Sequence, residues 1–135
     1  MIISTFIQIL IISFLINLLW EVLHSQLYTT CIKAPLKKFI PLIIIASIKD
    51  GLWITFFYTL STYIFANTNI LTNQAQLLFF IFATLSFSFI DEKFSLKTKR
   101  WEYTNKMPQI LNIGISPLIE LATTGTLTFL YVFLI

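Results

Sequence analysis

Residues 2–23, IISTFIQILIISFLINLLWEVL, decide the fold, because they form a long apolar run in which Glu21 is the one charged residue. About 20 apolar residues in a helix span the hydrocarbon core of a bilayer. Three further apolar stretches, at about residues 41–65, 74–90 and 109–135, read in the same way. Backbone groups in lipid must be hydrogen-bonded within the protein, and a helix achieves this where an open sheet does not. The sequence therefore predicts a single all-α domain over residues 1–135, an integral membrane four-helix bundle.

The composition excludes a soluble domain. Hydrophobic residues make up 57% of the chain and charged residues only 11%, whereas soluble domains carry about 25% charged residues. The lone cysteine, Cys31, excludes an internal disulfide and any CxxC redox or zinc site. The residues after Met1 form no basic segment ahead of the apolar run, so we expect no cleaved signal peptide and a retained first span.

The basic residues predict how the chain is oriented. Eight of the nine lie in the first and third loops, namely Lys33, Lys37, Lys38, Lys93, Lys97, Lys99, Arg100 and Lys106. The positive-inside rule places both loops in the cytoplasm and both termini outside. We expect a multi-pass protein of a cell membrane, typical of a prokaryotic plasma membrane. Membrane orientation also explains the net charge of +3, so no nucleic acid is expected as a partner.

A polar stripe crosses the cytoplasmic half of the first span. Asn17, Glu21, His24 and Tyr28 are spaced i, i+4, i+7 and i+11, which places them on one helix face. A Glu three residues before a His can serve as an acid/base pair or as metal ligands, as in helical di-iron proteins. Those proteins repeat the motif, and this chain has a single histidine. We therefore expect no metal and no cofactor, and a stripe that only hydrogen-bonds neighbouring helices stays open.

The second span contains Lys49-Asp50-Gly51. Counting from Pro41 at about 1.5 Å per residue places the charged pair about 12 Å deep. Charges in hydrocarbon cost at least about 2.5–3.5 kcal/mol each, so each is a candidate for function. Adjacent helical residues point about 100° apart, so each should meet another helix. An interhelical ion pair that fixes packing is the alternative, with Glu21 and Glu120 as the expected partners of Lys49.

The third loop opens with Asp91 and Glu92, which close the third span and could turn inward toward Glu21 and His24. Trp101 and Tyr103 fit the aromatic belt of a membrane interface. Lys97, Lys99 and Arg100 precede Trp101. We expect these cations to be solvated or bound to anionic lipid headgroups.

The fourth span contains Pro117 and Glu120. Pro117 lacks an N–H and should kink the helix, freeing carbonyls near Ile113. An unpaired carboxylate in the membrane takes up a proton, so Glu120 should be either salt-bridged or neutral. A neutral carboxyl there could donate a proton to an apolar substrate, and pairing with Lys49 is the structural alternative.

These groups fall in one depth band, so four packed helices could place them around one cavity that opens toward the cytoplasm or the inner leaflet. The catalytic candidates are Glu21, His24, Asp50 and Glu120. The substrate-binding candidates are Asn17, Trp20, Lys49, Asp91, Glu92, Trp101 and Tyr103.

The second half of the chain, with Asp91, Arg100-Trp-Glu-Tyr103, Met107-Pro108 and Gly114-Ile-Ser-Pro-Leu-Ile-Glu120, resembles the small membrane domain of the heterodimeric lycopene cyclases. It departs from that pattern at Leu121, where a second Glu is usual, and in the spacing from Pro117 to the acid. The resemblance implies a shared architecture and acid chemistry on a lipophilic substrate. The whole chain is also similar to small prokaryotic four-span proteins that carry the stripe and Arg-Trp-x-Tyr-x-x-x-Met-Pro, which implies the architecture alone.

Three function classes remain open from the sequence. The first is an enzyme doing acid/base chemistry on an isoprenoid or lipid, with Glu120 or Asp50 as proton donor and Glu21–His24 as relay. The second is a proton-coupled transporter of small molecules, which uses the same carboxylates. The third is an accessory subunit whose buried charges pair with a larger membrane partner. The expected partners are membrane lipid and a lipophilic small molecule, with a homo-oligomer or larger complex open.

Overall fold

The structure is a computed structural model that describes residues 2–135, and the described chain is almost entirely helical. The expected all-α fold is confirmed. Four long helices, α1 (Ile2–His24), α3 (Leu36–Phe65), α4 (Gln74–Lys97) and α5 (Ile115–Leu134), account for most of the chain. The remaining elements are short: the 3₁₀ turns η1 (Ser25–Leu27) and η2 (Ile70–Thr72), helix α2 (Thr29–Ile32), and strands β1 (Gln109–Ile110) and β2 (Ile113–Gly114), which pair as an antiparallel hairpin.

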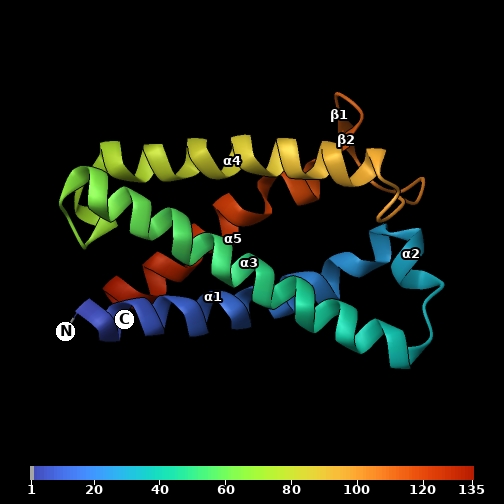
Figure 1. Cartoon of the computed structure of the whole chain (residues 1–135), viewed down its shortest axis with the longest axis horizontal. Helices are drawn as coiled ribbons and strands as arrows, with labels where there is room; N and C mark the ends of the chain where they lie inside the picture. Colours follow the sequence, from blue (N-terminus) through green and yellow to red (C-terminus); the bar gives the residue numbers. More distant parts are fainter. Residues whose placement is uncertain (1) are drawn as a thin grey trace.

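The four long helices lie side by side along the long axis of the molecule (Figure 1). Helix α1 packs most extensively on α3 and also contacts α5, while α4 packs mainly on α5 and less on α3. The end of α5 lies beside the start of α1, at the same end of the bundle as the connector that contains η2. Helix α2, the β1–β2 hairpin and the loop before it lie at the opposite end. The bundle therefore has one end with both chain termini and one end with both long loops.

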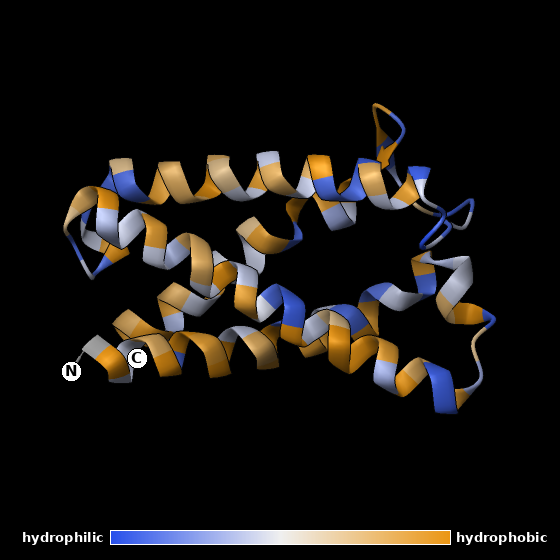
Figure 2. Ribbon diagram, in the orientation of Figure 1, coloured by the Kyte–Doolittle hydropathy of each residue, from blue (hydrophilic) through white to orange (hydrophobic). Residues whose placement is uncertain are grey.

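Three of the long helices are long and apolar enough to cross a membrane: Ile3–Leu27, Leu36–Phe65 and Ile115–Leu134. Large apolar side chains also stand exposed on all four long helices, whose ribbons are mostly in the hydrophobic orange of Figure 2. Exposed apolar area of this extent is far beyond what a soluble monomer carries, and it marks a contact surface for lipid or protein. The interior, by contrast, contains small polar residues such as Ser13, Ser47 and Thr124. This distribution is that of a membrane protein.

Close packing of α1 against α3 depends on Gly51. A Cβ atom at this position would lie 3.3 Å from both the backbone nitrogen of Phe14 and the hydroxyl oxygen of Ser13. The Ser13 hydroxyl donates to the carbonyl oxygen of Leu10 and, at 3.4 Å, to that of Gly51. Small residues allow helices in membranes to approach closely enough for such contacts. Because Asp50 precedes Gly51, this contact also sets the position of Asp50 against α1.

The helix boundaries differ from the expected ones at three places, the first being α4, which ends at Lys97 and not near residue 90. Helix α3 begins at Leu36, after Pro35, and continues through Pro41. Proline early in a helix removes only one hydrogen bond, and the turn survives. The fourth helix begins at Ile115 and not near residue 109, because residues 109–114 form the β1–β2 hairpin, whose turn places Leu111 and Asn112 at positive φ. Pro117 consequently lies in the first turn of α5, where its N–H would have no helical partner, and not where it would kink the helix.

The close approach at Gly51 leads to the first prediction. Gly51→Val should lower the free energy of unfolding by about 1–3 kcal/mol, since its side chain overpacks the contact with α1. The measurement is unfolding of the purified protein by SDS titration in mixed micelles. Leu52→Val, at a neighbouring side chain that is exposed on the lipid face, is the matched control. Equal stability of the two variants would show that α1 and α3 are not in tight contact.

Candidate functional site

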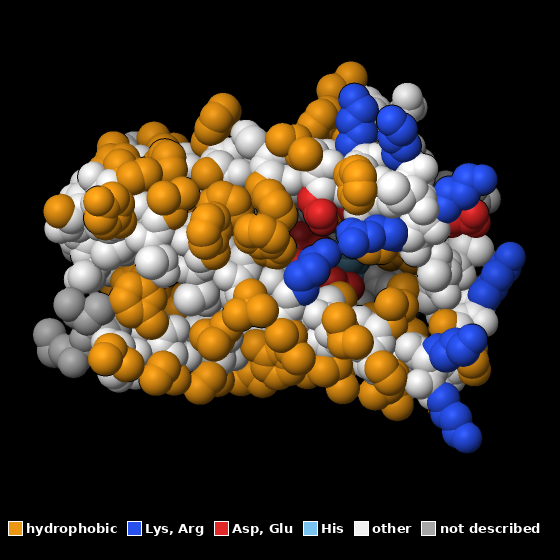
Figure 3. Space-filling view, viewed as in Figure 1, with side chains coloured by type: hydrophobic (Ala, Val, Ile, Leu, Met, Phe, Trp, Pro, Cys, Tyr) orange, Lys and Arg blue, Asp and Glu red, His pale blue; other side chains and the backbone are white. Residues whose placement is uncertain are grey.

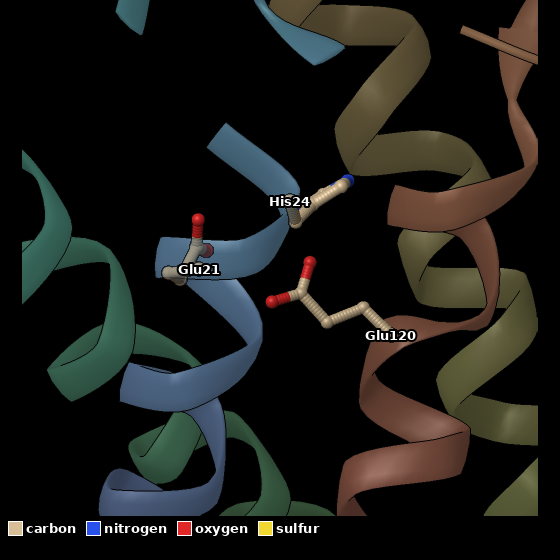
Figure 4. Close-up of side chains that lie close together, drawn as sticks. All are labelled: Glu21, His24 and Glu120. Carbon is tan, nitrogen blue, oxygen red and sulfur yellow. The ribbon is translucent and has the colours of Figure 1, made fainter. Parts of the chain in front are cut away.

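Three helices converge on one buried cluster of ionisable side chains. Glu21 and His24 lie one turn apart at the end of α1, Asp50 lies near the middle of α3, and Glu120 lies in the second turn of α5. One side-chain donor atom from each of Glu21, His24 and Glu120 lies within 4.8 Å of the other two. The carboxyl group of Glu120 extends from α5 toward the end of α1 that carries Glu21 and His24 (Figure 4). The four residues expected to be catalytic are therefore brought together.

The three carboxyl groups in this cluster are crowded together. Glu21, Asp50 and Glu120 line the same cavity, and carboxyl oxygens of Glu21 and Glu120 lie within 4.8 Å of each other. Asp50 and Glu120 are both buried. Ionised carboxylates this close repel one another, so a proton or a cation among them would relieve the repulsion.

His24 has unused hydrogen-bonding capacity. Its side chain is 5% exposed, and neither ring nitrogen has a hydrogen-bond partner within residues 2–135. The ring is packed edge-on between Trp20 and Tyr28, with centroid distances of 5.9 Å and 5.1 Å. One oxygen of Glu120 is likewise buried without a partner in the described chain. Leaving a buried polar group unpaired costs about 1–3 kcal/mol, so a ligand or ion that bonded to these atoms would be stabilising.

A cavity of about 120 Å³ opens beside the cluster between α3 and α4. Figure 3 shows it as a hollow in one face of the bundle, with red carboxyl groups inside and blue cations at its edge. Its deeper wall includes the buried Asp50 and Glu120, and its rim includes Lys49 and Arg100. The apolar part of the lining comprises Leu42, Ile43, Ala46, Phe87, Pro117 and Leu121. The cavity therefore joins an acidic interior to a lateral opening that carries both apolar and charged side chains.

Lys49 closes part of this opening by pairing with Asp91. Its Nζ atom lies 3.6 Å from an Asp91 carboxylate oxygen and 5.7 Å from the centre of the Trp101 ring. Both partners of the ion pair are partly exposed. The expected pairing of Lys49 with Glu21 or Glu120 is wrong, because the long lysine side chain reaches outward from α3 to the rim of the cavity. As expected, Lys49 and Asp50 meet different helices.

Glu92 anchors the loop between α4 and α5. The Trp101 indole donates to a Glu92 carboxylate oxygen at 2.9 Å, and the Tyr103 hydroxyl donates to the same oxygen. The Gly114 N–H donates in turn to the Tyr103 hydroxyl at 3.0 Å. Burial, followed by the bond to Glu92, raises the pKa of the Tyr103 phenol, so it remains a donor. Glu92 turns inward as expected and lines the same cavity as Glu21, while its hydrogen bonds go to the loop.

The same loop is bound to the chain that follows α1. The Thr29 N–H donates to the Glu102 carbonyl at 2.9 Å, and the Thr104 N–H donates to the Leu27 carbonyl at 2.8 Å. Tyr28 and Tyr103 lie opposite each other in this bridge. These bonds close the loop end of the bundle over the acidic cluster.

Of the site residues predicted from the sequence, some line the cavity and others do not. Those that line the cavity are Glu21, Lys49, Asp50, Asp91, Glu92, Trp101 and Glu120. His24, Trp20 and Tyr103 lie behind it, and Asn17 is buried one turn further along α1, where its amide donates to the Ser13 carbonyl at 2.8 Å. Sequence reasoning missed Arg100, which it assigned to solvent although it lines the cavity. The sequence signal for Arg100 was its position directly before Trp101, which was itself a substrate-binding candidate.

Comparisons with protein-family models, with curated proteins and with solved structures give no match for this chain. The function of the site is therefore inferred from its own residues.

The anchoring role of Tyr103 leads to the second prediction. Tyr103→Phe should lower the free energy of unfolding by about 1–3 kcal/mol, because Glu92 loses a donor and the Gly114 N–H loses its acceptor. It should also speed proteolytic cleavage within residues 98–114. Tyr63→Phe, at a side chain that is 86% exposed, provides the control and should change stability by less than about 0.5 kcal/mol. If both variants behave alike, the loop does not depend on this network.

Proposed function

We propose that this chain is a multi-pass membrane enzyme that performs acid/base chemistry on a lipid or isoprenoid substrate, in an intramembrane cavity that faces the cytoplasm. The observation that carries the proposal is the cluster of three carboxyl groups around one cavity, beside a buried histidine without a hydrogen-bond partner in the described chain. Groups of this kind in a site of low dielectric constant are typical of proton transfer at active sites. Glu120 or Asp50 would donate the proton, and Glu21 with His24 would form the relay.

Stability alone gives no reason for this cluster. Buried ionisable groups are often less stabilising than well-packed apolar residues of the same size. Within residues 2–135, Lys49 is the basic residue whose charge acts on both Glu21 and Asp50, and it is already paired with Asp91. If the cluster served only packing, burial of three acidic groups would therefore cost free energy of folding without a compensating gain in stability.

The distribution of charge supports a four-span topology with both termini outside. The lysine and arginine side chains gather at the loop end of the bundle (Figure 3), and the connector between α3 and α4 has none. The positive-inside rule then assigns the loop end to the cytoplasm. Helix α4 supplies the fourth span in this topology, since it lies alongside the others and exposes Leu78, Phe82 and Ile90.

The shape of the cavity supports a substrate with a long apolar part. A volume of about 120 Å³ accepts one functional group, since sites that enclose whole drug-sized ligands have about 300–1,000 Å³. The opening between α3 and α4 is bordered by Leu42 and Phe87, so the rest of the molecule would lie against the helices in the bilayer. The resemblance of the second half of the chain to the lycopene cyclase membrane domain favours an isoprenoid among such substrates.

The topology can be tested with single cysteines in a Cys31→Ser background. Lys37→Cys and Thr68→Cys place the thiol at exposed positions, at opposite ends of the bundle. In intact cells, a membrane-impermeant maleimide should label the Thr68 variant and spare the Lys37 variant until the membrane is permeabilised. The reverse pattern would invert the orientation, and equal labelling of both positions in intact cells would overturn the four-span topology.

The enzymatic role can be tested through the lipids of cells that express the protein. Wild-type expression should change the level of at least one lipid or isoprenoid in mass spectra of total extracts. Glu120→Gln and Glu21→Gln should abolish that change, because neither amide can transfer the proton. Glu102→Gln is the matched control, since Glu102 is exposed and outside the cavity lining.

Two outcomes would contradict the enzymatic role. One is a lipid change that survives both Glu→Gln substitutions. The other is an unchanged lipid profile together with proton flux in liposomes that requires Glu21, which would assign transport.

A further inference from the structure

The donor atoms around His24 have the composition of a metal site. Glu21 and Glu120 each offer a carboxylate oxygen and His24 offers a ring nitrogen, all within 4.8 Å of one another. Ligands at about 2.0–2.2 Å from a tetrahedral metal ion lie about 3.3–3.6 Å apart. Side-chain rotations that move the two glutamate oxygens by roughly 1 Å would therefore bring the three donor atoms to the separations that a metal ion requires.

The unpaired atoms point to a missing ligand. His24 and Glu120 are both more than nine-tenths buried, at 5% and 7% exposure. In the chain from residue 2 to 135, the unpartnered buried atoms include both His24 nitrogens and one Glu120 oxygen. Figure 4 shows the Glu120 carboxyl extending toward the residues on α1. One cation placed among them would bind one His24 nitrogen and a Glu120 oxygen, and it would also screen the repulsion between the carboxylates.

We propose that Glu21, His24 and Glu120 bind one divalent transition-metal ion of the Zn²⁺ type. An imidazole with two carboxylates suits Zn²⁺, Mn²⁺ or Fe²⁺, whereas Mg²⁺ and Ca²⁺ take oxygen ligands and leave imidazole unused. Three protein ligands leave a position open toward the cavity, as in catalytic metal sites. Asp50 lines the same cavity as both glutamates and lies outside the ligand set.

The absence of a metal was expected from the sequence because Glu21 and His24 form a single Glu-x-x-His motif. The fold supplies the further ligand from α5, about 100 residues away in the chain, and the neighbouring carboxyl from α3. Metal binding deepens the proposed function, since a metal-bound water beside Asp50 would then serve as the acid/base group. Binding itself is measured without a substrate and stands apart from enzymatic activity.

The direct test uses the full-length protein purified in detergent, stripped with a chelator and titrated with Co²⁺. The wild type should bind one Co²⁺ per chain with visible absorption bands, Zn²⁺ should displace it, and a large excess of Mg²⁺ should not. Glu120→Gln and Glu21→Gln should each weaken Co²⁺ binding at least tenfold, whereas Glu102→Gln should not change it. Equal binding by the Glu120→Gln and Glu102→Gln variants would overturn the proposal.

A second measurement needs no variant, which matters if the substitutions prevent folding. His24 is the only histidine of the chain, so protein labelled with ¹⁵N-histidine gives the signals of this one imidazole. Zn²⁺ should shift one of its two ring-nitrogen resonances at one equivalent, and unchanged resonances would overturn the proposal. If the protein binds metal but does not change cellular lipids, the enzymatic role is wrong and metal binding stands. If the lipid change does not depend on bound metal, the acid/base role stands without the metal.

Discussion

The contact among three carboxyl groups from three different helices is the constraint on which the rest of the structure depends. Glu21, Asp50 and Glu120 line one cavity inside the helix bundle, where each charge has a high desolvation cost. The helices must hold them at fixed separations for any shared proton or cation to offset that cost. The close approach of α1 and α3 at Gly51 and the start of α5 just before Pro117 provide this positioning. The helices are therefore packed around the acidic cluster, which is the group of side chains with the highest desolvation cost.

The loop between α4 and α5 completes the site from outside the bundle. It is attached to α4 through Glu92 and to the chain after α1 through backbone hydrogen bonds. The acidic cluster is thereby closed toward the loop end, and the cavity opens sideways between α3 and α4. Access from the side suits a molecule that is dissolved in the bilayer. A soluble molecule would have to pass the bound loop.

The sequence predicted the helical fold and the residues of the cluster, because apolar runs and charges inside them are local signals. It predicted wrong partners for Lys49, which pairs with Asp91, since adjacent positions in a helix do not reveal which neighbour a long side chain reaches. It also predicted a kink at Pro117, because the hairpin at residues 109–114 has no periodic pattern to distinguish it from a helix end. The meeting of Glu120 with His24 depends on how α5 packs on α1, and no pattern within either segment encodes that.

The unequal lengths of the helices have a consequence for the depth of the site. Asp50 lies 14 residues from the start of α3, whereas Glu120 lies five residues from the start of α5. At about 1.5 Å per residue these distances are about 21 Å and 8 Å. Since Asp50 and Glu120 line the same cavity, α3 extends further toward the loop end than α5 does. Its first turn, which carries Lys37 and Lys38, lies at the loop end of the bundle.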